Sequence, residues 1–296
     1  MKGILAGSPV FIQLLALLTG ILTGAVLAGC VSLILNMIFP CNSSGSIRML
    51  QAVLFFSQIA MFLLPALFTA CLCSEHPRKF LYIQGFPEGR LLLWTVSATF
   101  LISPAISVVS YWNMQMQLPE ALAPLEAWMR EMEESSAEAL NLLINGEGWM
   151  HLAANIVVIA VLASVTEEFI FRGALFSILR KSIRNPHVTI WLIAVIFSAI
   201  HFQFFGFLPR MLLGAYLGYL LYWTKNIWIP VTAHFLYNAT AVVAMSNDSL
   251  KENPLFAEEI TSGDAGWLSV TAVVCLVFFA GCVRMIYRSK SEAENH

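Results

Sequence analysis

Apolar residues along this sequence gather in blocks of about 20 residues, each bounded by charged residues or by stretches rich in proline and glycine. A transmembrane α-helix needs about 20 mostly apolar residues to cross the hydrocarbon core of a bilayer. The pattern therefore predicts an all-α, polytopic membrane protein with about eight transmembrane helices. The predicted spans cover residues 10–38, 50–73, 91–112, 152–177, 188–206, 208–224, 226–246 and 266–287.

The first span raises the question of a cleaved leader. Leu27-Ala28-Gly29-Cys30 resembles a bacterial lipobox, in which the cysteine is lipidated after signal cleavage. The apolar run continues beyond Cys30, however, and its total length from Pro9 exceeds that of a signal-peptide apolar region. We therefore expect this span to be retained as the first helix.

The spans divide the chain into regions of one integral membrane domain, which we expect to cover residues 1–296. Three spans lie within 1–112, and an acidic loop follows at 113–151. Four spans fill 152–246, and a loop, the last span and a basic tail make up 247–296. The acidic loop is expected to contain an amphipathic helix near the membrane surface, because its apolar residues recur at helical spacing. Those residues are Leu122, Leu125, Trp128, Met129 and Met132.

The distribution of lysine and arginine predicts the orientation in the membrane. With a cytoplasmic N-terminus, eleven of the sixteen Lys and Arg residues lie in cytoplasmic segments or at the cytoplasmic ends of spans, and four lie in outside segments or at the outer ends of spans, while Arg172 lies in the interior of a span. Cytoplasmic loops of membrane proteins carry an excess of these residues. We therefore expect both termini in the cytoplasm, the acidic loops 113–151 and 247–265 outside, and the bacterial inner membrane as the location.

The amino-acid composition further limits the class of protein to which the chain can belong. Of the 296 residues, 58% are hydrophobic and only 11% are charged, against about 25% charged residues in a typical soluble domain. These values exclude a soluble globular enzyme, a disordered chain and a nucleic-acid binder. Most of the six cysteines lie within apolar blocks, and none is spaced as in a zinc site or a disulfide framework.

The fourth span contains three ionisable residues, Glu167, Glu168 and Arg172. Each costs about 2.5–3.5 kcal/mol at mid-membrane, so such groups face a protein interior or a water-filled cavity. Glu168 and Arg172 are four residues apart and can pair, whereas Glu167 is turned by about 100° from Glu168. One cation cannot neutralise two carboxylates. Glu167 is therefore the candidate base, whereas Glu168 and Arg172 fit a purely structural ion-pair network as well as they fit a direct chemical role.

Further polar residues follow in the fifth and seventh spans. His201 comes four residues after Phe197, and His234 and Asn238 are four apart on one helical face. Imidazole can donate, accept or shuttle a proton near neutral pH, and an amide can donate to an oxyanion without changing its charge. We expect Glu167, Glu168, His201, His234 and Asn238 to line a common cavity, because intramembrane polar groups must meet each other or water.

Three motifs emerge: EExxxR at 167–172, FxxxH at 197–201 and HxxxN at 234–238. Their order and separation resemble the CPBP family, the CAAX proteases and bacteriocin-processing enzymes also called Abi proteins. The resemblance covers about residues 160–245. It implies an intramembrane glutamate endopeptidase that needs no metal or other cofactor and cuts a peptide or membrane-protein substrate.

The same resemblance implies a role for each motif residue. Glu167 would activate a water, and His201 would help to position or polarise it. His234 and Asn238 would stabilise the oxyanion. Glu168 and Arg172 would hold the site in shape, and Phe197 would support it.

Several rival functions remain. A zinc protease could use two histidines and a glutamate, but the sequence contains no HExxH motif. A non-catalytic membrane protein could sequester a peptide or partner, as an immunity protein does. A proton-coupled transporter also buries Glu, Arg and His, yet it usually shows internal repeats, which this sequence lacks. Serine proteolysis lacks a recognisable nucleophile motif.

Overall fold

The computed structural model describes residues 2–38, 43–146, 148–247, 250 and 262–293, and no strand occurs in these ranges. The all-α polytopic fold predicted from the apolar blocks is confirmed. Within the described residues, six helices are long and apolar enough to cross a membrane. They cover Val10–Ile38, Ile47–Cys73, Gly89–Met114, Trp149–Leu179, Phe204–Thr224 and Asp264–Arg288.

The eight predicted spans each coincide with helical structure in the described ranges. The first is α1 (Val10–Ile38), and the second is the rod α2–η1–α3 (Ser43–Gln58, Ile59–Leu63, Leu64–Cys73). The third is α5 (Gly89–Met114), and the last is α14 (Ser262–Ala293). The fifth to seventh correspond to α10 (Pro186–Ala199), α11 (Phe207–Thr224) and α12 (Trp228–Met245).

Two of the eight helices differ from the others in length or polarity. At about 1.5 Å per residue, the 14-residue α10 spans about 21 Å, which is less than the roughly 30 Å hydrocarbon core. Helix α12 carries His234, Tyr237 and Asn238 among its 18 residues. Helix α10 packs on α11, and α12 packs on η3, α5 and α8. The polar side chains of Thr189, Ser198 and His234 on these two helices are buried.

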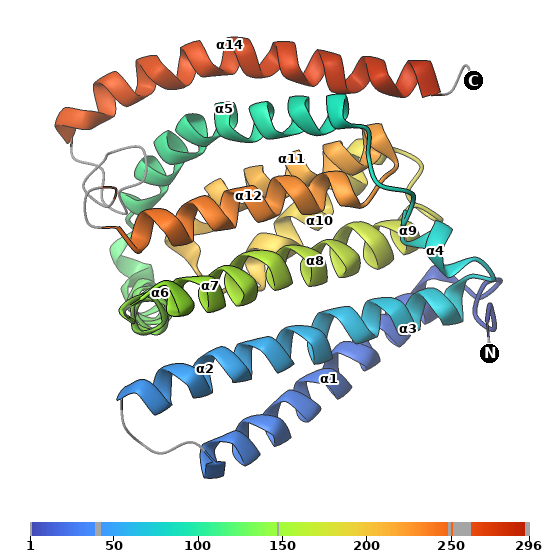
Figure 1. The fold of residues 1–296 in the computed structure, drawn as a ribbon, viewed down its shortest axis with the longest axis horizontal. Helices are drawn as coiled ribbons and strands as arrows, with labels where there is room; N and C mark the ends of the chain where they lie inside the picture. The colour runs from blue at the N-terminus through green and yellow to red at the C-terminus, as the bar shows by residue number, and fades with distance from the viewer. Residues whose placement is uncertain (1, 39–42, 147, 248–249, 251–261, 294–296) are drawn as a thin grey trace.

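The fourth span is a long rod at the centre of the bundle (Figure 1). It consists of α7 (Trp149–Asn155), η3 (Ile156–Leu162), α8 (Ala163–Glu168), η4 (Phe169–Leu175) and α9 (Phe176–Leu179). Segments η3 and η4 are π-helical, so the short α8 is held between two widened turns. Such π-helical turns occur frequently at functional sites.

Three further short segments complete the described elements, and one longer helix lies across an end of the bundle. Helix α4 (Pro77–Phe80) follows α3, and the 3₁₀ turns are η2 (Glu120–Leu122) and η5 (Phe204–Gly206). Helix α6 (Ala123–Ile144) is seen end-on in Figure 1, roughly perpendicular to the long helices. It occupies the region where the sequence predicted an amphipathic helix. The second acidic loop, 247–265, lies mostly outside the described residues.

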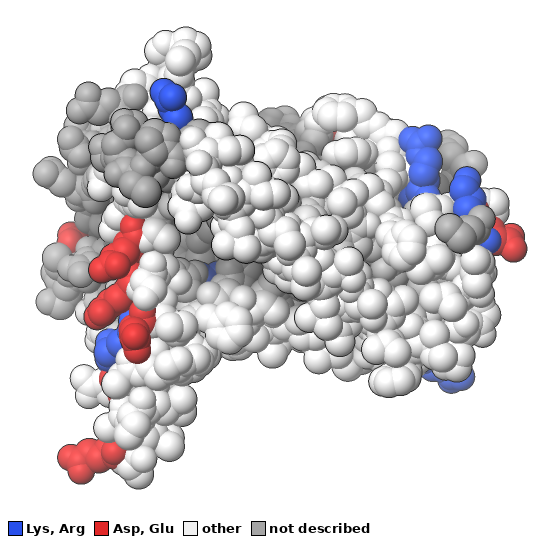
Figure 2. Space-filling view, turned by 90° about the horizontal axis from the view of Figure 1, so that it is seen from below, with Lys and Arg blue, Asp and Glu red and all other residues white. Residues whose placement is uncertain are grey.

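Charged side chains separate toward the two ends of the bundle. Lys and Arg gather at the end where both chain termini lie, and Asp and Glu gather at the opposite end, along α6 (Figures 1 and 2). Arg78 and Lys79 of α4 belong to the basic end. There Lys181 also donates hydrogen bonds to Gln13 and to the Cys73 carbonyl. The asymmetry agrees with the lysine and arginine bias read from the sequence.

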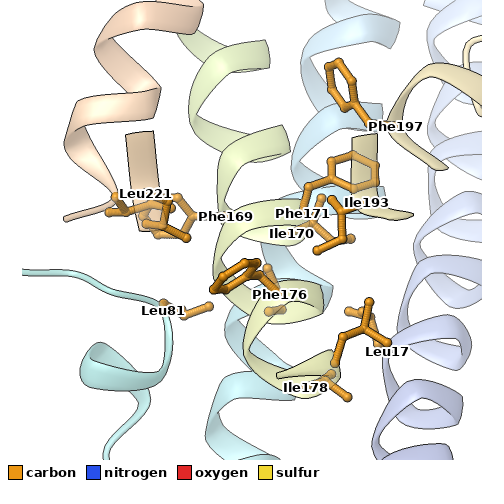
Figure 3. Close-up of a cluster of buried hydrophobic side chains, with 14 of the residues drawn as sticks. Leu17, Leu81, Phe169, Ile170, Phe171, Phe176, Ile178, Ile193, Phe197 and Leu221 are labelled. Atoms are coloured by element: carbon orange, nitrogen blue, oxygen red, sulfur yellow. The ribbon is translucent and has the colours of Figure 1, made fainter. Parts of the chain in front are cut away.

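The core surrounds the central rod. Phe169, Ile170, Phe171, Phe176 and Ile178 are buried in one cluster, which extends to α1, α10 and α11 (Figure 3). A second cluster joins α5, α11, α12 and α14. Helices α10 and α11 approach closely because α11 presents glycine toward its neighbour. A Cβ at Gly218 would lie 2.9 Å from the Ile190 side chain. Small residues permit such close helix contacts in membranes.

Candidate functional site

The two glutamates of the EExxxR motif occupy adjacent positions on α8 but very different surroundings. The Glu168 side chain is fully buried, whereas that of Glu167 is 14% exposed. The turn of about 100° between neighbouring helical residues explains the difference. It directs Glu168 into the bundle and Glu167 toward a cavity.

Glu168 forms the centre of a buried polar cluster. Its Oε1 atom accepts a hydrogen bond from Nη1 of Arg172 at 2.8 Å, which is the pairing that the four-residue spacing predicted. The same oxygen lies 2.9 Å from Nδ1 of His234 on α12. An ionised carboxylate only accepts hydrogen bonds, so Nδ1 of His234 is the donor. Glu168 thus connects the central rod to α12 and fixes the orientation of the His234 ring.

Arg172 joins this cluster to α10 and α11. Its Nη2 atom donates to the carbonyl oxygen of Gly214 at 2.8 Å. Its guanidinium carbon lies 4.7 Å from the centre of the Phe197 ring, a cation–π arrangement. Because Gly214 has no side chain, α11 can pack this closely against Phe197. A Cβ at Gly214 would lie 3.1 Å from the Phe197 ring.

Phe197 packs against both histidines of the site as well as against Arg172. Its ring centre lies 5.1 Å from that of His201 and 6.0 Å from that of His234. Phe171 packs edge-on against it at 5.3 Å, as Figure 3 illustrates. The Phe197 ring thus fills the space between Arg172 and the two imidazole rings.

Glu167 faces His234 across the edge of a cavity of about 480 Å³. Its Oε2 atom lies 3.9 Å from Nε2 of His234, which is beyond direct hydrogen-bond distance. Glu167, His201, His234 and Asn238 all line this cavity. Glu168 does not line it and instead lies behind His234. The common cavity expected from the sequence thus contains four of the five expected residues, and the expectation was wrong for Glu168, whose helical position turns it into the buried layer.

His201 and Asn238 are each held by a backbone carbonyl. Nδ1 of His201 lies 2.7 Å from the Phe197 oxygen, so this nitrogen carries the proton and Nε2 is left as an acceptor. Nδ2 of Asn238 donates to the Ile159 oxygen at 3.2 Å. That carbonyl belongs to the π-helical segment η3. One amide N–H and the side-chain oxygen of Asn238 remain for other partners.

Helix α5 forms the wall of the cavity that faces the motif residues, and this wall was not predicted from the sequence. Hydroxyl side chains recur there at intervals of three or four residues, and this spacing in an otherwise apolar helix was the available signal. Ser103 donates to the Thr99 oxygen and Ser107 to the Ser103 oxygen, so these hydroxyl groups satisfy their donors locally. The hydroxyl residues of α5 that line the cavity are Thr99, Ser103, Ser107 and Ser110.

Two further cavity residues, Arg210 and Tyr237, also lie outside the three motifs. Arg210 is in the first turns of α11, and Tyr237 precedes Asn238 on α12. Neither could be assigned to the site from spacing alone, because the side that each helix turns to the cavity depends on its packing.

The possible metal ligands of the site do not converge. Among the described residues, no three His, Cys, Asp or Glu side chains are grouped so that they could hold a metal ion. Nδ1 of His234 is engaged by Glu168, and Nδ1 of His201 by a carbonyl.

Comparison with known proteins supports the resemblance that the three motifs indicate. Residues 149–240 match a family model described as Type II CAAX prenyl endopeptidase Rce1-like. The matched segment includes all three motifs and confirms the resemblance to CAAX proteases. The uncharacterized protein YpbD of Bacillus subtilis (strain 168) is 30% identical over 89 residues, which are 29% of this chain and 42% of that protein. The chain thus covers less than half of this relative's length.

No solved structure matches the chain.

Proposed function

We propose that this chain is an intramembrane endopeptidase in which Glu167 activates the water that attacks a peptide bond. The observation that carries the proposal is the contrast between the two adjacent glutamates. Glu168 is neutralised by Arg172 and hydrogen-bonded to His234, whereas Glu167 faces the cavity without a hydrogen-bonded cation. A general base must reach the water from which it takes a proton, and only Glu167 of the two lines the cavity.

The contacts of His234 suit it to the role of oxyanion donor. Glu168 holds its Nδ1, and its Nε2 faces Glu167 and the cavity. In the imidazolium form, Nε2–H can donate to the oxygen that becomes negative during attack. Glu168 holds the other ring nitrogen, so the donor is oriented before the substrate binds.

The remaining site residues have complementary roles in this proposal. Nε2 of His201 accepts a hydrogen bond from the attacking water, because its Nδ1–H is committed to the Phe197 carbonyl. Asn238 offers its second amide N–H to the oxyanion. After attack, Glu167 returns the proton to the leaving nitrogen, and the peptide bond breaks. These steps need no metal ion or other cofactor.

We also propose that both termini are cytoplasmic and that α6 lies on the opposite side of a cell membrane. The gathering of Lys and Arg at the terminal end supports this orientation (Figure 2). Leu140 of α6 and Gly206 of η5 line the cavity. The substrate would then be a peptide or membrane-protein segment that reaches the site from the α6 side.

Cleavage by the purified protein tests this function. The detergent-solubilised protein is incubated with a peptide library, and products are identified by mass spectrometry. We expect cleavage by the wild type and by Glu134→Gln, which alters an exposed glutamate of α6, and its loss in Glu167→Gln. Undiminished cleavage by Glu167→Gln would reject Glu167 as the base. Peptide retention without cleavage by the wild type would favour the sequestering alternative.

A further inference from the structure

The cavity contains an arginine that the proposed chemistry does not use. Arg210 is half-buried and lines the same cavity as Glu167. Its guanidinium is held by Gln203: Nη1 donates to the Gln203 carbonyl at 3.4 Å, and Nη2 donates to the Gln203 side-chain oxygen. Both acceptors are neutral. The interaction therefore fixes the direction of the guanidinium without balancing its charge.

Arg172 provides the contrast within the same bundle. Its guanidinium is paired with the carboxylate of Glu168 at 2.8 Å and is completely buried. Arg210 belongs to none of the ion pairs formed by the described residues, which join Arg130 to Glu126, Arg172 to Glu168, and His234 to Glu167 and Glu168. A cation at this position is costly unless an anion or water compensates it.

The carboxylates near Arg210 are directed to other partners. Glu133 and Glu167 are both within electrostatic range of its guanidinium. However, Oε2 of Glu133 accepts a hydrogen bond from the Phe205 amide at 3.1 Å, and Oε2 of Glu167 faces Nε2 of His234. A guanidinium has five N–H donors, and the two bonds to Gln203 leave donors available on the cavity side.

We propose that Arg210 binds a carboxylate of the peptide substrate inside the cavity. This inference rests on the proposed function only in taking the cavity as a peptide site. A guanidinium and a carboxylate form two parallel hydrogen bonds, and the pair strengthens where water is excluded. The carboxylate can come from an acidic side chain or from the peptide's C-terminus, since both present the same two oxygens.

The surroundings define the substrate class more narrowly. Exposed charges interact with one another only over about 10 Å at 0.1 M salt. The glutamates of α6, whose Leu140 lines the cavity, therefore disfavour a peptide with many carboxylates more than one with a single carboxylate. Apart from the motif residues and Arg210, the cavity wall is formed largely by apolar groups and hydroxyls, such as Phe100, Ile106 and Ser103. The expected ligand is therefore an apolar peptide segment with one carboxylate.

A retention experiment tests this subsite without requiring catalysis. Glu167→Gln protein, purified in detergent, is immobilised and offered three libraries of ten-residue apolar peptides. The first library has one internal Glu and a C-terminal amide. The second has Gln in place of that Glu and keeps the C-terminal amide. The third also has Gln but ends in a free C-terminal carboxylate. Mass spectrometry measures retained peptides. We expect about tenfold stronger retention of the first or third library than of the second, as for a charge-assisted hydrogen bond. The library retained identifies the source of the carboxylate.

Second substitutions in the Glu167→Gln background separate binding from folding. Adding Arg210→Gln should reduce retention of the preferred library, the first or the third, to that of the second library, which has no carboxylate. Arg210→Lys should keep part of the preference because it keeps the positive charge. Arg130→Gln, at an exposed arginine of α6, should keep all of it. Equal retention of all three libraries, or a preference that survives Arg210→Gln, overturns the proposal. Failure of the proposed catalysis would appear separately, as absence of cleavage by the wild type.

Discussion

Nδ1 of His234 lies 2.9 Å from the same Glu168 oxygen that accepts the hydrogen bond from Arg172. This contact gives the two neighbouring glutamates different tasks. Glu168 orients the histidine from behind, and Glu167 faces the other ring nitrogen from the cavity side. The following expectations test this division and the elements that maintain it.

Arg172→Leu should destabilise the protein more than Glu167→Gln does. Removing the guanidinium leaves the Glu168 carboxylate buried without its cation, and breaking a buried pair in this way commonly costs about 3–5 kcal/mol. Glu167→Gln nearly preserves volume and changes a group that borders the cavity. Thermal unfolding of the two purified variants in detergent measures the difference. Equal midpoints would show that Glu168 does not depend on Arg172.

Asn238→Ala should retain weak turnover. Loss of one oxyanion donor in a known hydrolase lowers the rate by about 10²–10³, and His234 would remain as the other donor. Glu167→Gln should leave less activity, because no base remains at that position. Initial rates of peptide cleavage provide the comparison, with Asn141→Ala on the exposed side of α6 as the control. An Asn238→Ala enzyme as active as this control would remove Asn238 from the site.

Activity should persist after prolonged treatment with strong zinc chelators. In the proposed reaction Glu167 takes the proton and His234 with Asn238 donates to the oxyanion, so no step requires a Lewis acid. Cleavage rate and metal content should be measured on the same sample before and after chelation. Stoichiometric zinc, together with activity that returns only when zinc is added back, would contradict the glutamate mechanism.

Glu126 should make the attachment of α6 dependent on pH. The hydrogen bond from the Leu118 amide, and then the Arg130 guanidinium, lower the pKa of Glu126 below its ordinary value. A lowered folded-state pKa means that the stabilisation is complete above the ordinary value near 4.5 and is lost as pH falls through the lowered value.

Glu126→Gln should therefore unfold at a lower temperature than the wild type at pH 7. The two melting temperatures should converge as the pH is lowered below 4.5, when the wild-type carboxyl gains its proton. Melting curves of both proteins across this range test the expectation. A difference that stays constant with pH would show that the Glu126 charge does not contribute.

Much of the fold could be predicted because the membrane imposes a length and an apolarity on each helix. The amphipathic spacing of Leu125, Trp128 and Met132 likewise indicated α6. The π-helical segments on either side of α8 could not be anticipated, since they depend on how the rod packs against its neighbours. The same holds for the end of α10 at Ala199, because the apolar residues Ile200 and Phe202 still follow it but lie outside the helix.

The site was predictable where polar residues stood out from an apolar background. Glu167, Glu168, Arg172, His201, His234 and Asn238 were found in this way, and helical spacing gave the Glu168–Arg172 pair. The contact between His234 and Glu168 joins residues 66 positions apart, so only the packing of α12 on α8 reveals it. Arg210 was missed for the same reason, whereas the regular spacing of the α5 hydroxyls was visible in the sequence and only their position in the cavity required the packing.

Comparative peptidomics tests the central claim most directly. Membranes from cells that contain the intact protein are compared with membranes that contain Glu167→Gln at the same level. The account predicts a defined set of peptides, with shared cleavage positions, that is released only by the intact protein, while their uncut precursors accumulate with Glu167→Gln. Identical peptide sets from the two membranes would contradict it.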